Sequence, residues 1–165
     1  MKPYIQNKKN LVCYQKDIIV KLKKLAQSTN NNRARIKIHK SERDKTNEMI
    51  IALKKNSYIR PHIHPSLKTE SYHIIKGKMN VYVFSKKGKK IKVIKMGHIG
   101  TNLNFFYRAN KSYYHLPMAV TEWCIYHEVY SGPFKKTKDV KYAKWSPLEF
   151  EKKAVNKFLS KIGHR

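Results

Sequence analysis

The sequence predicts an all-β fold, a β-sandwich or double-sheet jelly roll, with an α-helix at each end of the chain. Between residues 33 and 130, apolar and polar side chains alternate with a period of two, as in strands whose two faces differ. About eight such segments are short and are separated by turn signals. Near both termini, apolar residues recur at helical spacing instead.

The N-terminal element is predicted to be an amphipathic helix over residues 15–27. Its apolar residues, among them Ile18, Leu22 and Leu25, share one face, and lysines occupy the opposite face. The polar stretch 28–32 ends this helix, because Asn and Ser side chains compete for backbone groups and favour turns. A linker therefore separates the helix from the strands.

The alternation is clearest over residues 33–38, where Arg33, Arg35 and Lys37 alternate with apolar residues. Residues 79–84 alternate in the same way. The other strands are expected at 48–54, 70–76, 90–96, 103–108, 112–116 and 123–130.

A second helix is predicted from Pro147. The sequence 146–149 offers Ser as an N-cap, Pro at the first helical position and Glu three residues after the cap. An apolar stripe with helical spacing follows and ends near Gly163; it comprises Phe150, Ala154, Phe158 and Ile162. This stripe is expected to pack on the sheet.

The chain is strongly basic, with 37 Lys and Arg against 10 Asp and Glu and a net charge of +27. This charge favours an anionic partner. Nucleic acid is not expected, because the excess is mostly Lys spread along the chain rather than clustered Arg. We expect a cytoplasmic protein, since no apolar run approaches the ~18 residues of a membrane span and no secretory signal is recognisable.

The most specific pattern is the pair His62 and His64, followed by Glu70. Residues two apart on a strand face the same side, so both imidazoles can reach one metal ion, and Glu70 can add a carboxylate. A fourth ligand should come from a separate strand. We favour His115. His127 remains the alternative, because strand parity alone does not distinguish the two histidines.

These residues resemble the first motif of the cupin superfamily, in which an HxH pair is followed by Glu and Gly. The matching residues are His62, His64, Glu70 and Gly77. His115 takes the place of the histidine in the second cupin motif. A longer series of blocks resembles the WbuC-type cupin fold metalloproteins, which are encoded in polysaccharide and O-antigen gene clusters. The blocks are residues 32–35 with His39, 57–65, 70–77, 128–133 and 145–149.

The resemblance implies a cupin-type double-stranded β-helix, or jelly-roll barrel, over residues 33–134. Residues 1–32 would form the N-terminal helix and linker, and residues 135–165 a C-terminal extension with a helix, all within one domain. It also implies a divalent metal ion (Fe, Mn, Zn or Ni), held by His62, His64, Glu70 and His115.

Arginine is scarce here, and its fork binds phosphate or carboxylate through two hydrogen bonds. Arg60, two residues before His62, is expected to face inward with it, although an ion pair with Glu48 or Glu128 is the alternative. The full set of expected substrate-binding residues is Arg60, Arg33, Arg35, His39 and Lys68.

The leading functional hypothesis is a metal-binding cupin that binds or modifies a small anionic sugar or nucleotide-sugar in polysaccharide biosynthesis. As an enzyme it would be a metal-dependent sugar isomerase or epimerase, with the ion acting as a Lewis acid. The alternatives are an Fe(II)-dependent oxygenase and a non-catalytic, metal-organised ligand-binding module. No catalytic residue is assigned, and a homodimer is one expected state.

Overall fold

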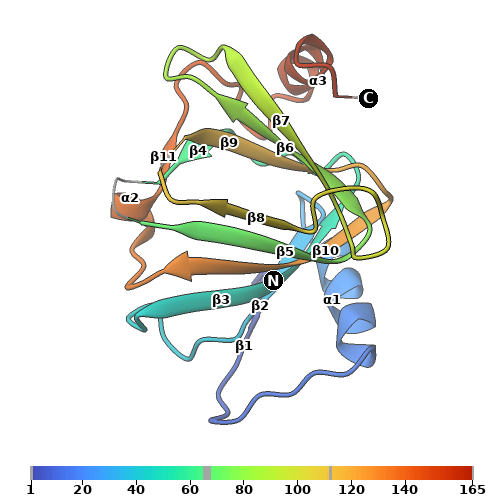
Figure 1. Cartoon of the computed structure of the whole chain (residues 1–165), viewed down its shortest axis with the longest axis vertical. Helices are drawn as coiled ribbons and strands as arrows, with labels where there is room; N and C mark the ends of the chain where they lie inside the picture. Colours follow the sequence, from blue (N-terminus) through green and yellow to red (C-terminus); the bar gives the residue numbers. More distant parts are fainter. Residues whose placement is uncertain (1, 65–67, 112, 165) are drawn as a thin grey trace.

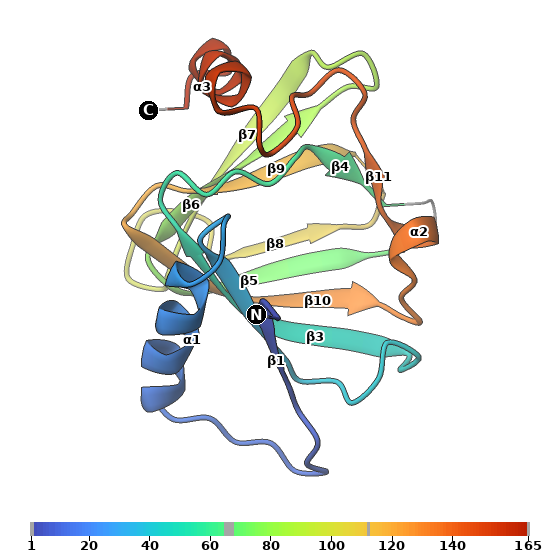
Figure 2. The same ribbon diagram turned by 180° about the vertical axis from the view of Figure 1, so that it is seen from behind.

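The computed structural model describes residues 2–64, 68–111 and 113–164. Within them the strands form two sheets that lie face to face (Figures 1 and 2). The six-stranded sheet, in the order β1-β2-β3-β10-β5-β8, comprises Tyr4–Gln6, Arg33–Lys37, Thr46–Lys54, Trp123–Ser131, Glu70–Lys76 and Phe106–Ala109. The five-stranded sheet, in the order β11-β4-β9-β6-β7, comprises Lys141–Tyr142, His62–Ile63, Tyr114–Ala119, Lys78–Phe84 and Lys90–Gly97.

The predicted all-β class is confirmed. Neighbouring strands pair antiparallel, except that β1 runs parallel to β2. Sequence-distant strands become neighbours: β10 lies between β3 and β5, and β4 pairs with β9 so that His62 stands opposite His115. The strand expected over 112–116 begins at Tyr114; Ser112, like Pro65 in the block 57–65, lies outside the described residues.

Two helices cover outer faces of the sheets. Helix α1, Asp17–Gln27, packs its apolar side on β2, β3 and β10, in a cluster that contains Leu22, Ala34 and Ile125. Helix α3, Lys152–Lys161, packs Val155 and other apolar side chains against the main core on the far side of the five-stranded sheet (Figure 1). No helix in the described part of the chain is long and apolar enough to cross a membrane.

The C-terminal helix begins later than the sequence predicts. It starts at Lys152 rather than Pro147, and residues 147–151 are not helical. The polar side chains of the expected capping box have other partners: Ser146 Oγ accepts from Arg60 Nε at 3.2 Å and donates to the nearby Ala143 O at 2.8 Å, and Glu149 Oε1 accepts from the Arg60 backbone N–H at 3.3 Å. These bonds compete with the local cap, and the chain makes a turn at residues 149 and 150 before the helix begins.

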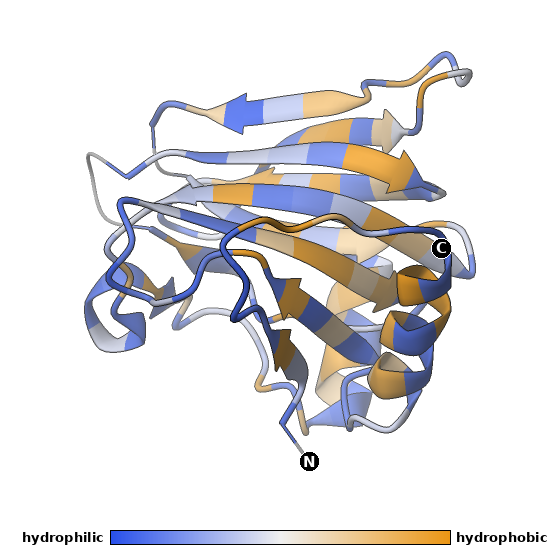
Figure 3. Ribbon diagram, turned by 90° about the horizontal axis from the view of Figure 1, so that it is seen from below, coloured by the Kyte–Doolittle hydropathy of each residue, from blue (hydrophilic) through white to orange (hydrophobic). Residues whose placement is uncertain are grey.

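Strand β2 shows how the alternating pattern is used. Figure 3 shows hydrophilic and hydrophobic bands alternating along the strands. In β2 the apolar residues Ala34 and Ile36 lie under α1, whereas Arg33, Arg35 and Lys37 line a cavity between the sheets. Because α1 covers the outer face, the charged side of this strand faces the interior.

Candidate metal centre and its cavity

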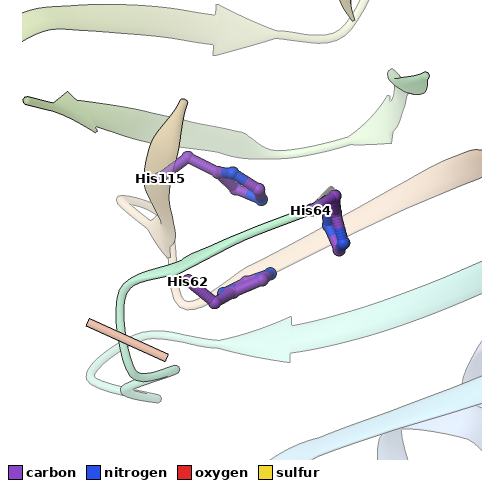
Figure 4. A group of neighbouring side chains, drawn as sticks. All are labelled: His62, His64 and His115. Carbon is purple, nitrogen blue, oxygen red and sulfur yellow. The ribbon is translucent and has the colours of Figure 1, made fainter. Parts of the chain in front are cut away.

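Three histidines converge between the sheets. His62 lies on β4, His64 follows directly after it, and His115 lies on β9, and their potential ligand nitrogens are all within 4.8 Å of one another. Figure 4 shows the three rings pointing toward a common point. The ring centroids of His62 and His115 are 4.4 Å apart, and that of His64 lies 5.2 Å and 5.3 Å from them. The expected convergence of the HxH pair with a histidine from a separate strand is therefore present.

Backbone carbonyl groups orient all three imidazoles. The Nδ1 atoms of His62, His64 and His115 lie 3.1, 2.7 and 3.1 Å from the carbonyl oxygens of Arg60, Asp139 and Tyr113. A carbonyl oxygen only accepts, so each Nδ1 carries a proton, and in the neutral form of each ring Nε2 has the free lone pair that a metal ion needs. The carbonyl of Asp139 comes from the short helix α2, Lys136–Asp139. This arrangement is typical of metal-binding histidines, in which the second nitrogen is held by a backbone or carboxylate oxygen.

Glu70 places its carboxylate among these rings. Its Oε1 lies 3.2 Å from His64 Nε2 and its Oε2 lies 3.2 Å from His115 Nε2, and the residue is only 4% exposed. Oε2 makes no hydrogen bond with the described residues. A buried carboxylate oxygen without a hydrogen-bond donor, facing imidazole nitrogens, fits a site for a divalent cation.

Electrostatics favour the ligand-competent forms of His62 and Glu70. Burial and the neighbouring histidines lower the pKa of His62 well below its usual range, so this imidazole stays neutral. Burial raises the pKa of Glu70, but the adjacent His115 and His64 outweigh it and hold that pKa well below the usual range. For His64, burial lowers the pKa, but the hydrogen bond and charge of Glu70 raise it overall. Histidine nitrogens and one carboxylate suit Fe, Mn, Zn or Ni; that these four residues bind metal stays a prediction.

The centre opens into a cavity of about 450 Å³ between the sheets. Arg33, Arg35 and His39 line it together with His62, His64 and Glu70. Neither the Arg33 nor the Arg35 guanidinium makes a hydrogen bond or ion pair with the residues that the structure describes. Burial lowers the pKa of Arg35, and the charge of Arg33 lowers it further. Two guanidinium groups that line the same side of the cavity and form no ion pair with a described carboxylate can bind an anion.

His39 presents a second polar atom to this cavity. The Glu48 backbone N–H donates to His39 Nδ1 at 3.0 Å, so Nε2 carries the proton. That Nε2 is buried without a hydrogen-bond partner among the described residues. Its nearest charged neighbour is Glu42 Oε2, at 3.7 Å. That His39 donates to a bound ligand stays a prediction.

Glu128 is the functional candidate that the sequence analysis missed, having considered it only as an ion-pair partner for Arg60. It lies on β10 and lines the cavity. Two sets of charges act on its carboxyl group: Glu70 of the candidate metal centre, and Arg35 and Arg33 of β2. Burial, followed by repulsion from Glu70, raises the pKa of Glu128 to about 7 against the opposing effect of the arginines. A carboxyl group that titrates near neutral pH can accept or release a proton. A sequence signal for Glu128 was available: it is two residues from both Tyr126 and Tyr130 on the predicted strand, so these three side chains share one face.

Arg60 does not face the cavity, and the expected inward direction is wrong. Its Nη2 donates to Ala143 O at 2.7 Å, its Nε donates to Ser146 Oγ at 3.2 Å, and its guanidinium lies 5.7 Å from the ring centre of Tyr142. Residue 60 precedes β4 and is not part of a strand, so the two-residue period does not apply to it. Arg60 instead fastens the C-terminal extension to the barrel.

The remaining candidates also have defined places. Lys68 donates to the carbonyl oxygens of Ser131 and Pro133 at 3.1 and 2.6 Å, so its ammonium group is held at the end of β10. His127, the alternative metal ligand, is paired with His73 rather than with the three clustered histidines. The cluster therefore contains His115.

Two face-to-face sheets with a histidine cluster between them define a cupin-type double-stranded β-helix, and solved structures show the same fold. Protein SO0799 from Shewanella oneidensis is 11% identical, with a TM-score of 0.58 over 79% of this chain and 85% of that one. An uncharacterized conserved protein with a double-stranded β-helix domain from Klebsiella pneumoniae is 16% identical, with a TM-score of 0.50 over 70% and 88%. Oxalate oxidase in complex with the substrate analogue glycolate is 15% identical, with a TM-score of 0.50 over 82% and 75%.

Sequence comparison places the chain in a family. Residues 14–96 match the family described as a domain of unknown function, DUF6016, and the chain belongs to that family. The match contains α1, the arginine strand β2, the HxH pair and Glu70, but it ends before His115 and Glu128. No curated protein matches the sequence.

Proposed function

We propose that this protein is a metal-dependent cupin that binds, and chemically modifies, a small anionic sugar or nucleotide-sugar in cytoplasmic polysaccharide (O-antigen) biosynthesis. The resemblance to the WbuC-type proteins supplies the pathway in this proposal. The observation that carries the ligand class is that Arg33, Arg35 and the three clustered histidines line one cavity. Its volume of about 450 Å³ lies within the range of small-molecule sites.

Each part of the cavity has a role in the proposal. His62, His64, His115 and Glu70 would hold a divalent ion, which as a Lewis acid polarises a carbonyl or hydroxyl oxygen of the ligand. Arg33 and Arg35 would bind the phosphate or carboxylate group of the same ligand. Glu128, between these two groups of charges, would exchange a proton with the ligand, as isomerisation or epimerisation requires.

The metal part is tested by elemental analysis and thermal unfolding of the double variant His62→Ala/His64→Ala. We expect loss of the bound ion and loss of the stabilisation that the ion gives the wild type, because an ion that binds only the folded state adds its binding free energy to folding. His98→Ala, which removes an exposed imidazole, is the matched control and should keep both. Stoichiometric metal in the double variant would place the ion elsewhere.

The ligand part is tested by calorimetry with sugar phosphates, sugar acids and nucleotide-sugars on the metal-loaded protein. Arg35→Lys should weaken binding about tenfold or more although the charge is kept, since the two-point contact is lost. Arg43→Lys, a change at an exposed arginine, is the control and should bind like the wild type. Equal affinity in Arg35→Lys, Arg33→Lys and wild type would remove these arginines from the ligand site.

An oxygen-consuming enzyme is the second candidate. Histidine and carboxylate ligands around Fe(II) can leave positions for substrate and O₂, and the fold is shared with an oxalate oxidase whose structure contains the small acid glycolate. Oxygen uptake by the iron- or manganese-loaded protein with small carboxylic acids would favour this candidate. A product with the same atoms as the substrate and no oxygen uptake would favour the isomerase.

A further inference from the structure

A second pair of histidines lies on the outer face of the six-stranded sheet. His73 on β5 and His127 on β10 stand directly opposite each other in the strand register. Their Nδ1 atoms are 3.3 Å apart, and the two rings are nearly parallel, at 23° and 5.5 Å between centroids. Strand alternation places both side chains on the opposite face from Tyr72 and Glu128, which line the cavity. This pair is therefore separate from the metal centre described above.

The surroundings hold both rings in place. Phe106 of β8 stacks on His73, with ring centroids 4.8 Å apart and an angle of 21°. On the other side, His127 Nε2 lies 3.9 Å from Glu48 Oε1 of β3. A carboxylate near Nε2 favours a proton on that nitrogen, which leaves the Nδ1 lone pair of His127 pointing at His73. Burial also lowers the pKa of His127, which favours the neutral ring.

Two Nδ1 atoms at 3.3 Å can share one proton or bind one cation. Imidazole nitrogens bind transition metals at about 2.0–2.1 Å, so two of them on one tetrahedral ion stand about 3.3 Å apart. The observed spacing therefore needs little rearrangement for chelation. From this match, the fixed rings and the carboxylate behind His127, we propose that His73 and His127 form a second metal site, which binds an imidazole-preferring ion such as Zn²⁺ or Cu²⁺.

The chemistry of the pair selects the class of ion. Neutral imidazoles suit Zn²⁺, Cu²⁺ and Ni²⁺, whereas Mg²⁺ and Ca²⁺ prefer oxygen ligands. The His127 side chain is 25% exposed, so an ion can enter from solvent and keep water in its remaining positions. With two protein ligands, this site should bind more weakly than the cluster of three histidines and Glu70.

The test is a titration with Zn²⁺ alone, followed by calorimetry and by the NMR signals of the imidazole C–H groups. The wild type should bind two ions, the second more weakly, and the signals of His73 and His127 should shift with the second ion. His62→Ala/His64→Ala should keep this second event, whereas His73→Ala and His127→Ala should each weaken it at least tenfold. Glu48→Gln should weaken it by about tenfold, as expected for a carboxylate that orients a ligand.

His98→Ala is the matched control and should leave both binding events unchanged. His127→Gln, which keeps a hydrogen-bonding side chain on β10, serves if the alanine variant unfolds; it should also lose the second event. The proposal is overturned if no bound ion shifts the signals of His73 and His127 in the wild type, or if the ion that shifts them remains in folded His73→Ala or His127→Gln. Either result would leave the pair as a hydrogen bond between two neutral imidazoles.

Discussion

The substitution Glu128→Gln tests the electrostatics of the cavity. Glu128 has its pKa raised from 4.5 to about 7, first by burial and then by the charge of Glu70. A carboxyl group with a higher pKa in the folded than in the unfolded state binds more protons when folded. Its contribution to stability is therefore fully present below pH 4.5 and is lost as the pH rises to about 7. Glutamine does not titrate, so the variant escapes this loss.

The magnitude follows from the change in pKa. One pKa unit corresponds to about 1.4 kcal/mol, so a rise from 4.5 to about 7 gives an upper limit of roughly 3 kcal/mol. For a chain of 165 residues this corresponds to about 6–12 °C in melting temperature. Part of the Glu128 side chain reaches the open cavity, where solvent screening reduces the effect. We therefore expect a stabilisation of several degrees at pH 8 and almost none at pH 4.5.

The assay is thermal unfolding of wild type and Glu128→Gln between pH 4.5 and 8, in the presence of a chelator, because a bound cation would offset the charge of Glu70. Glu122→Gln makes the same charge change at an exposed position and is the control; its difference from the wild type should not change with pH. The reasoning fails if Glu128→Gln is less stable than the wild type at pH 8. That outcome would show that Arg33 and Arg35 hold Glu128 as a stable carboxylate.

Three further predictions concern the framework around the site. Arg60→Ala should lower the free energy of unfolding by about 1–3 kcal/mol, because it removes two partly buried side-chain hydrogen bonds to the C-terminal extension, yet metal content by elemental analysis should not change. Gly77→Ala should destabilise the fold strongly in denaturant titrations, because φ is +85° and a Cβ would stand 2.1 Å from the Trp123 carbonyl oxygen; a wild-type midpoint would contradict this. A thiol reagent should label exposed Cys13 and spare Cys124, whose pKa burial raises to about 12; mass spectrometry of the native protein counts the labels.

Local sequence patterns determined much of the fold. The two-residue alternation of β2 and β6 and the apolar stripe of α1 are present where expected, since each depends on the period of one element. Strands β1 and β11 were missed, because Tyr4–Gln6 and Lys141–Tyr142 are too short to show a period. The helix expected from Pro147 begins at Lys152 because a tertiary partner, Arg60, competes for the side chains of its cap.

For the candidate site, the sequence by itself predicted that His62 and His64 lie close together, since side chains two residues apart in an extended segment point to the same side. Only the tertiary structure decided which distant residues meet them. The pairing of β4 with β9 brings in His115, whereas the facing direction of β10 sends Glu128 into the cavity and His127 to the outer surface. Such choices depend on which strands become neighbours and on which face α1 covers, and no local period contains that information.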